Sequence, residues 1–113
     1  MNQNEIIELM IKSIEKFKDF IFIKAHDDSM SPRICKGDDV QIDTSMPIEE
    51  GKVVAVELDE NILFRRIYRN MDGYLLAADN KDYPPIMCAA SQILGVAVRV
   101  HIDVDKLLER DYS

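Results

Sequence analysis

The chain begins with apolar residues that recur at alternating intervals of three and four positions. These intervals place them along one stripe of a helix, and Asn2 followed by Glu5 resembles a capping pair at its start. The spacing predicts an amphipathic helix over residues 3–21, whose apolar side packs on its own domain or binds a partner helix. The repeating positions are Ile7, Met10, Ile14, Phe17 and Ile21.

From residue 21 onward, short apolar runs are separated by turn residues. Several of the runs alternate apolar and polar positions, as half-buried strands do. Asp59-Glu60 leaves a break short enough for a hairpin, and Asp72-Gly73 is a turn signal. This pattern predicts a mainly β domain over residues 22–113, preceded by the helical segment 1–21 and ending in a short helix at 105–111. The strand-like runs lie at 21–23, 40–42, 53–58, 62–68, 75–76 and 93–104.

The run 93–104 has the clearest alternation of all. We expect one face of this strand to be apolar and the other polar. The apolar side would carry Val96, Val98, Val100, Ile102 and Val104. The other side would carry Ala97, Arg99, His101 and Asp103.

Length, charge and cysteine content narrow the class of protein. A chain of 113 residues suits a single domain, and its net charge of −7 argues against direct contact with nucleic acid, which needs clustered Lys and Arg. Cys35 and Cys88 form no CxxC pair, so neither a disulfide framework nor a four-ligand zinc site is indicated. A reducing cytoplasm is the simplest location. No apolar run approaches the roughly 20 residues of a membrane span, and nothing indicates a cofactor.

Two histidines and a group of arginines are weak candidates for a site. His26 stands beside two aspartates, but neighbours on an extended chain point apart, so we expect no metal there. His101 lies on the polar side of its strand, which favours a solvated or interface role. In so acidic a chain, three arginines suit ion pairs with carboxylates better than phosphate binding: Arg65, Arg66 and Arg69.

The most informative segment is Asp28-Ser29-Met30-Ser31-Pro32, followed by Gly37-Asp38 and a short apolar strand. A serine in a polar turn before a proline is usually only a turn residue. Its spacing to Gly37-Asp38, however, resembles the nucleophile segment of the LexA and signal-peptidase clan, whose members are Ser–Lys proteases.

The resemblance continues in the family's order through four later segments. They are similar, in turn, to its "dGdivv" strand, its "tvKRl" strand, its "NpxYppI" turn and its closing "i.G.vv" strand. These segments are 48–56, 62–67, 79–86 and 93–98. The resemblance implies a LexA-like peptidase fold, a β-ribbon or partly open barrel, and the family's self-cleavage and dimerisation in phage repressors, other transcriptional repressors and SOS-response proteins.

The resemblance also implies roles for individual residues. Ser29 falls at the nucleophile position, and the backbone N–H groups of Ser29 and Asp28 fall where the family holds the oxyanion. Arg65 falls where the family has its lysine general base. A guanidinium cannot be deprotonated in a protein, so Arg65 cannot be that base, although it can hydrogen-bond Ser29 or bind a carboxylate.

Two further departures from the family concern the bond that is cut and the turn that presents the serine. Self-cleaving members cut an Ala-Gly or Cys-Gly bond well before the nucleophile, whereas all four glycines of this chain follow Ser29. We therefore expect no self-cleavage bond in the sequence given. Asp27 stands where the family often has a glycine, and its bulk is expected to alter the turn that presents Ser29.

Together these observations predict a LexA-like domain that dimerises and regulates transcription but has lost self-cleavage. We expect a homodimer that pairs through the strand 93–104 and the leading helix. Two alternatives stay open. One is an active serine peptidase that cleaves another chain with a different base, and the other is a non-catalytic domain that binds a separate or fused DNA-binding protein.

Overall fold

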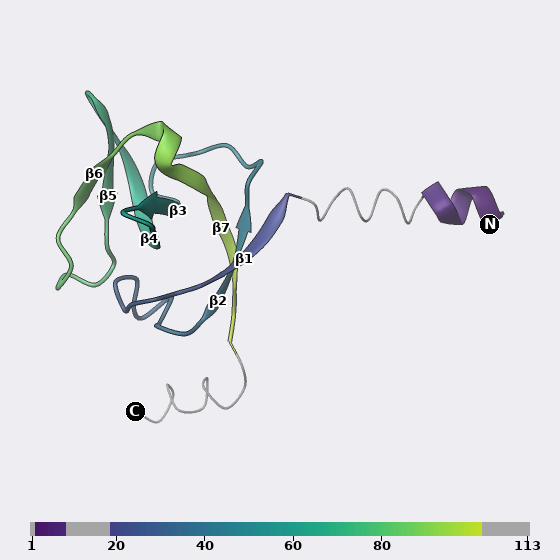
Figure 1. The fold of residues 1–113 in the computed structure, drawn as a ribbon, viewed down its shortest axis with the longest axis horizontal. Helices are drawn as coiled ribbons and strands as arrows, with labels where there is room; N and C mark the ends of the chain where they lie inside the picture. The colour runs from purple at the N-terminus through teal and green to yellow at the C-terminus, as the bar shows by residue number, and fades with distance from the viewer. Residues whose placement is uncertain (1, 9–18, 103–113) are drawn as a thin grey trace.

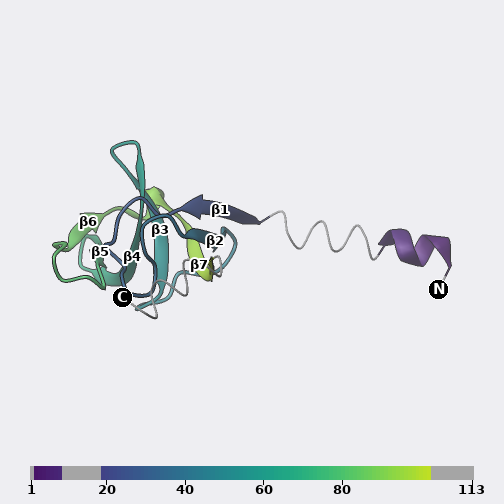
Figure 2. The same cartoon turned by 90° about the horizontal axis from the view of Figure 1, so that it is seen from below.

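In the computed structural model, which describes residues 2–8 and 19–102, one antiparallel sheet of seven strands dominates the molecule. The strand order is β1-β2-β7-β3-β4-β5-β6, and the sheet curls into a half-open barrel (Figures 1 and 2). The predicted mainly β fold is thereby confirmed. The strands are β1 (Phe20–Lys24), β2 (Asp39–Asp43), β3 (Val53–Leu58), β4 (Asn61–Asn70), β5 (Gly73–Ala77), β6 (Ile86–Cys88) and β7 (Ile93–His101), with a 3₁₀ turn, η1 (Ala90–Gln92), before the last.

The core consists of two apolar clusters on opposite faces of β3, since Ala55 belongs to one and its neighbour Val54 to the other. One gathers around Met30, Ile42 and Phe64, and the other around Val54 and Leu76. Alternate residues of the strands supply these side chains, because successive side chains of a strand point to opposite faces. Each fully buried aliphatic side chain contributes roughly 1.5–3 kcal/mol from removal of apolar area from water. The two clusters therefore hold the strands that carry the site.

The β3–β4 hairpin is the element that positions the arginines. Its turn residues Asp59 and Glu60 both have positive φ, at 50° and 67°, as a tight two-residue hairpin requires. This confirms the predicted hairpin. The register places Val54 opposite Arg65, and because neighbouring side chains alternate, Arg65 is buried while Arg66 is only partly so.

The leading helix is shorter at its C-terminal end than the apolar spacing predicts. The apolar spacing places Phe20 and Ile21 in that helix, but they belong to β1, where they pair with Asp43 and Ile42 of β2. The aromatic and β-branched run from Phe20 favours a strand, and β2 supplies its hydrogen-bonding partner. The predicted helical positions 9–18 and the predicted helix at 105–111 lie outside the described residues.

The start of the leading helix agrees with the prediction. Residues 3–8 are helical, the Glu5 N–H donates to Asn2 Oδ1 at 2.8 Å, and the Asn2 N–H donates to Glu5 Oε2 at 3.3 Å. This reciprocal pair satisfies backbone donors that a helix start leaves free. The apolar residues Ile6 and Ile7 are each 46% exposed.

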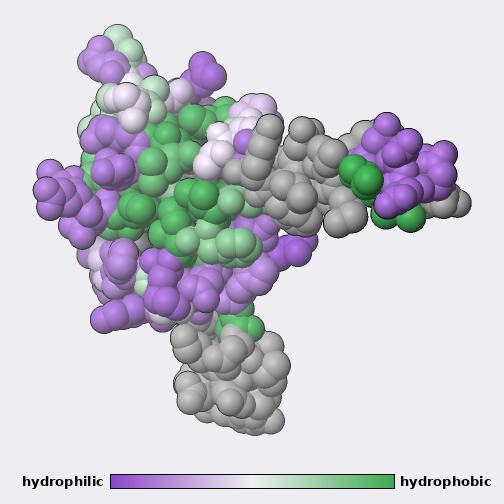
Figure 3. All heavy atoms as spheres, turned by 45° about the vertical axis from the view of Figure 1, so that its right-hand side comes forward, coloured by the Kyte–Doolittle hydropathy of each residue, from purple (hydrophilic) through white to green (hydrophobic). Residues whose placement is uncertain are grey.

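The simple two-faced pattern predicted for the last strand is wrong. A β-bulge lies where β2 pairs with β7, so that Gln41 lies opposite Arg99 but Ile42 lies opposite Ala97. The extra residue, Val98, is therefore displaced from the face that its spacing suggests and is 39% exposed. Ala97, expected on the polar side, packs against the core instead. Figure 3 shows apolar surface with hydrophilic residues around it on the face turned forward.

Gly95 of β7 marks the closest approach of this strand to β2. A Cβ there would lie 2.7 Å from the Asp43 carbonyl oxygen and 2.7 Å from Ile42 Cγ2. We expect Gly95→Ala to lower the free energy of unfolding by about 3 kcal/mol, because the core has no room for the added methyl. Urea unfolding followed by circular dichroism measures this loss.

Gly51→Ala is the matched control for this prediction. Gly51 has a φ of +84° but nothing within 4 Å of an added Cβ, so only the backbone cost of about 1 kcal/mol applies. A loss at Gly95 no larger than the loss at Gly51 would contradict the predicted clash.

Candidate active site

Ser29 lies in a turn within the segment 25–38, which connects β1 to β2. Its neighbour Met30 is 1% exposed and anchors the turn in the first core cluster, while Ser29 itself is 2% exposed. The Ser31 N–H donates to the Asp28 carbonyl at 3.0 Å, and the Ile34 N–H donates to the Met30 carbonyl at 3.1 Å. Anchored side chain and turn hydrogen bonds together hold Ser29 in one position.

The segment 79–86 lies against this turn and holds it from the other side. The Asn80 N–H donates to the Ser29 carbonyl at 2.9 Å, and Asn80 Nδ2 donates to the Asp28 carbonyl at 3.1 Å. The Asp28 carboxylate accepts a hydrogen bond from the Lys36 N–H at 2.9 Å. Two of the segments that carry the sequence resemblance are thus in direct contact, although they are far apart along the chain.

Arg65 reaches the same turn from β4. It is 3% exposed, and its Nη1 donates to Ser29 Oγ and to the Phe64 carbonyl. Among the described residues, its Nε is a buried side-chain nitrogen without a hydrogen-bond partner. The structure therefore brings together the two residues that the sequence places at the nucleophile and general-base positions. Their catalytic roles stay predictions.

Asp27 is the acidic residue that faces this pair. The Ser29 N–H donates to Asp27 Oδ1 at 3.0 Å. Burial by itself raises the pKa of Asp27, but hydrogen bonds from Ser29 and the positive charges of Arg65 and His26 outweigh it and lower the pKa below its usual value. Asp27 is thus held as a carboxylate. The sequence marked it only as a bulky replacement for glycine and gave no sign of this hydrogen bond.

The pKa of Arg65 depends on its burial and on its neighbours Asp27 and Tyr83. Burial lowers the pKa of Arg65, while the charge of Asp27 and interaction with Tyr83 oppose that shift. The Tyr83 ring lies beside the guanidinium, with 5.7 Å between Arg65 Cζ and the ring centroid. A guanidinium stays protonated even in such surroundings. Arg65 therefore presents a permanent positive charge to Ser29.

A groove of about 570 Å³ opens beside Asp27. Its walls come from the His26–Asp27 segment, from the ends of β3 and β4, and from β6, so no single stretch of sequence reveals it. Four of the lining residues are apolar and four are polar or charged. They are Leu58, Leu63, Ile86 and Met87 on the one hand, and His26, Asp27, Asp59 and Asn61 on the other.

Comparison with known proteins identifies the family of this chain. Residues 2–98 match the family described as Peptidase S24-like. The chain belongs to the Peptidase S24-like family. It is 32% identical over 100 residues to a LexA repressor of Thermosipho melanesiensis, covering 88% of this chain and 50% of that protein.

Two further LexA repressors are similar to this S24-like domain. The protein of Thermosipho africanus is 26% identical over 91 residues, covering 80% of this chain and 46% of the relative. The protein of Leifsonia xyli is 38% identical over 68 residues, covering 59% of this chain and 30% of the relative. The chain spans about half or less of the length of the curated relatives it matches. The resemblance found in the sequence is confirmed at the level of the family.

Lys52, just before β3, contacts side chains of the loop that precedes this strand. Lys52 Nζ lies 3.8 Å from Glu49 Oε2 and 3.9 Å from Met46 Sδ. Both partners belong to the loop before β3, away from the Ser29 turn. The contacts of the Lys52 ammonium are therefore made with this loop.

Arg66, the neighbour of Arg65 on β4, makes structural contacts in this S24-like domain. Arg66 Nε and Nη2 donate to the Asp79 carboxylate at 2.7 and 3.1 Å, and Arg66 Nη1 donates to the Gly51 carbonyl at 2.8 Å. Hydrogen bonding to Asp79 raises the pKa of Arg66. This two-point ion pair is the role expected for Arg66, and it anchors the segment that also carries Asn80.

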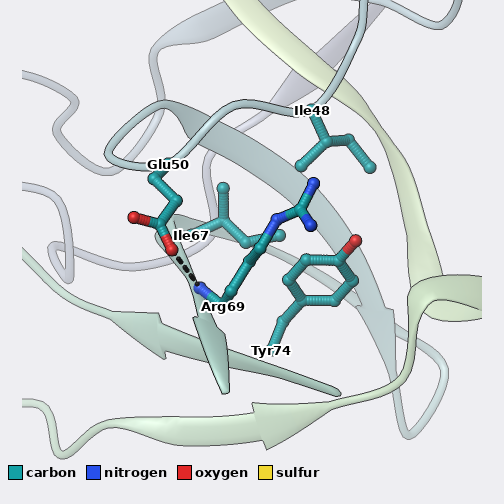
Figure 4. A pocket seen from close by; sticks show the side chains of 5 residues that line it. All are labelled: Ile48, Glu50, Ile67, Arg69 and Tyr74. Carbon is teal, nitrogen blue, oxygen red and sulfur yellow. Dashed lines mark hydrogen bonds between the residues drawn. The ribbon is translucent and has the colours of Figure 1, made fainter. Parts of the chain in front are cut away.

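A small pocket around Arg69 is packed too closely to hold a water molecule. The Arg69 backbone N–H donates to Glu50 Oε1 at 3.0 Å, and the Arg69 side chain lies between Ile48 and the Tyr74 ring (Figure 4). This pocket is packing around β4 and β5 rather than a ligand site.

Within residues 2–8 and 19–102, no three or more His, Cys, Asp and Glu side chains gather in a way that would hold a metal ion. The helical part of that range has no segment long and apolar enough to cross a membrane. Cys35 and Cys88 are free thiols, and burial raises the pKa of Cys88.

The lowered pKa of Asp27 makes the stability of the domain depend on pH. A carboxyl group whose pKa is lower in the folded state stabilises the fold above its unfolded pKa of about 3.9, and this contribution is lost as the pH falls through the folded value. We expect Asp27→Asn to be less stable than the wild type at about pH 6, with a difference that shrinks towards about pH 2.5.

Urea unfolding of both proteins across this range measures the effect. Asp82→Asn, at an exposed position, is the matched control for removing one negative charge. A difference between wild type and Asp27→Asn that stays constant with pH would contradict the assigned role of the Asp27 carboxylate.

Proposed function

We propose that this S24-like domain is a binding and dimerisation module in transcriptional regulation and that its peptidase step has been lost. The observation that carries this proposal is the hydrogen bond from the Arg65 guanidinium to Ser29 Oγ. It puts a permanent proton donor where the Ser–Lys mechanism needs a proton acceptor.

The chemistry of the step explains why this exchange matters. In a Ser–Lys site an uncharged amine removes the serine proton, and burial allows a lysine to lose its charge near neutral pH. Arg65 is buried as deeply as such a lysine would be, at 3% exposure, but stays charged. Asp27 is the acidic residue in contact with Ser29, and its lowered pKa makes its carboxylate a weaker base.

The groove beside Asp27 supports a binding role for the domain. It combines apolar side chains with polar groups and lies along β6, which is the last strand of the sheet. A peptide from another chain can pair with such an edge strand while its side chains enter apolar pockets. We propose a segment of a regulatory partner, or of a fused domain, as the bound peptide.

The similar proteins and the charge of the chain support a role in transcription. The relatives bear the name LexA repressor, and this chain covers half or less of each. With a net charge of −7 it is suited to protein contacts, so the DNA contact would be made by a basic domain on the same or another chain, in the cytoplasm.

Loss of the peptidase step is tested directly with the wild-type chain and Ser29→Ala. We expect no discrete fragments by intact-mass spectrometry after incubation at alkaline pH, and fluorophosphonate labelling no stronger than that of Ser29→Ala. A commercial serine protease serves as the positive control for the probe. Labelling that depends on Ser29, or any self-cleavage, would favour the alternative of an active peptidase that cuts in trans.

Exposed apolar residues on β1 and β7 support the dimer. Phe22 is 62% exposed and Val98 is 39% exposed. The Phe22 ring packs edge-on against His101 with 5.4 Å between ring centroids, and His101 Nε2 lies 3.2 Å from Gln41 Oε1. β1 is also an edge strand of the sheet. This half of the sheet thus offers both apolar side chains and an edge strand to a second copy.

We expect the chain to dimerise, and Phe22→Asp and Val98→Asp each to raise the dimer dissociation constant at least tenfold, or about 1.4 kcal/mol. A charge at either position would have to be desolvated in the interface. Sedimentation velocity over a concentration series measures the constant.

Met71→Asp is the matched control, because Met71 is 97% exposed in the β4–β5 turn, away from β1 and β7. A chain that stays monomeric at every concentration, or an equal effect of Met71→Asp, would contradict this interface.

A further inference from the structure

The backbone N–H of Ser29 already donates a hydrogen bond to a side chain of the same chain. If Ser29 stands at the nucleophile position, as proposed, this N–H and that of Asp28 would hold the oxyanion of a substrate. Here the Ser29 N–H donates to Asp27 Oδ1 at 3.0 Å, which is within the range at which such donors bind an oxyanion. A negatively charged oxygen of the chain itself therefore occupies the donor.

We propose that the Ser29 N–H, beside the positive charge of the Arg65 guanidinium, forms a carboxylate-binding site and that the chain fills its backbone donor with the side chain of Asp27. The inference rests on the proposed position of Ser29 in the S24-like site but not on the loss of activity. It goes beyond that loss, because it names a ligand class for the site and a group that keeps other ligands out.

The electrostatics of Arg65 support the site. A buried charge needs a compensating partner, since its removal from water is costly. Asp27 is the acidic residue whose charge acts on Arg65, and Arg65 acts on Asp27 in return. The Arg65 Nε has no hydrogen-bond partner among the described residues, so the guanidinium keeps a donor for a further oxygen.

The local geometry explains why the chain's own carboxylate occupies the site. An aspartate side chain that accepts from the N–H two residues later forms an Asx turn, which needs no long-range ordering. Being attached to the same turn, the Asp27 carboxylate has a high effective concentration at the Ser29 N–H. An external carboxylate, or a reacting carbonyl, must displace it. Replacing Arg65 with lysine would therefore leave the Ser29 N–H bound to the Asp27 carboxylate.

The test empties the site and supplies a free carboxylate. Asp27→Gly removes the side chain and leaves the Ser29 N–H and Arg65 in place. Thermal unfolding is compared in sodium formate and in sodium chloride at equal ionic strength. We expect formate to raise the Tm of Asp27→Gly in a saturable manner, by about 4 °C or more at saturation, because a ligand that binds only the folded state stabilises it. The wild type should show no formate-specific rise.

Asp27→Gly combined with Arg65→Met is the matched control and should lose the response to formate. The proposal is overturned if Asp27→Gly responds no more than the wild type, or if the double variant responds as strongly as Asp27→Gly. Neither measurement uses peptidase activity. The result is therefore read independently of Ser29 labelling, which tests the proposed function.

A measurement on the wild type covers the case in which Asp27→Gly fails to fold. The Ser29 amide proton, observed by ¹⁵N–¹H correlation NMR, should lie downfield and move upfield as Asp27 is protonated at acid pH. Its midpoint should fall below the ordinary aspartate value of about 3.9. A Ser29 amide that does not move through this range while the protein stays folded overturns the proposal.

Discussion

The buried guanidinium of Arg65 is the constraint on which the rest of the site depends. Its position on β4 follows from the hairpin register, which turns it inwards beneath the Ser29 turn. A permanent charge in that place must be hydrogen-bonded and balanced. Ser29 Oγ and the Phe64 carbonyl accept its hydrogen bonds, and Asp27 supplies the opposite charge.

The same constraint connects the chemistry of the site to its architecture. A peptidase of this type needs a group that loses its proton near neutral pH, and a guanidinium does not. The surroundings of Ser29 are nevertheless well ordered, since Met30 is anchored in the core and Asn80 holds the Ser29 and Asp28 carbonyls. The fold thus keeps a well-ordered turn at Ser29 and an open groove beside Asp27, and the proposed binding role rests on these two features.

Most of the strands were predictable because their cause is local. β3 needs only its β-branched run between Gly51 and the Asp59-Glu60 turn, and β4 follows from the same hairpin. Other features were not predictable in this way, and β6, with only three residues, is not among the predicted strands. Phe20 belongs to β1 because β2 supplies its strand partner. Val98 points outward because it is the extra residue of the bulge where β7 pairs with β2.

The sequence by itself determined which family the chain resembles and which residues stand at the key positions. The spacing around Ser29 and the arginine at position 65 are both linear features, and the inability of a guanidinium to act as a base follows from its chemistry alone. Only the tertiary structure decided how these groups meet. The hydrogen bond to Arg65 joins residues 36 positions apart, and the groove is assembled from three separate segments. The role of Asp27 depends on the direction of one side chain, which is set by the folded turn and by the charge of Arg65 beside it.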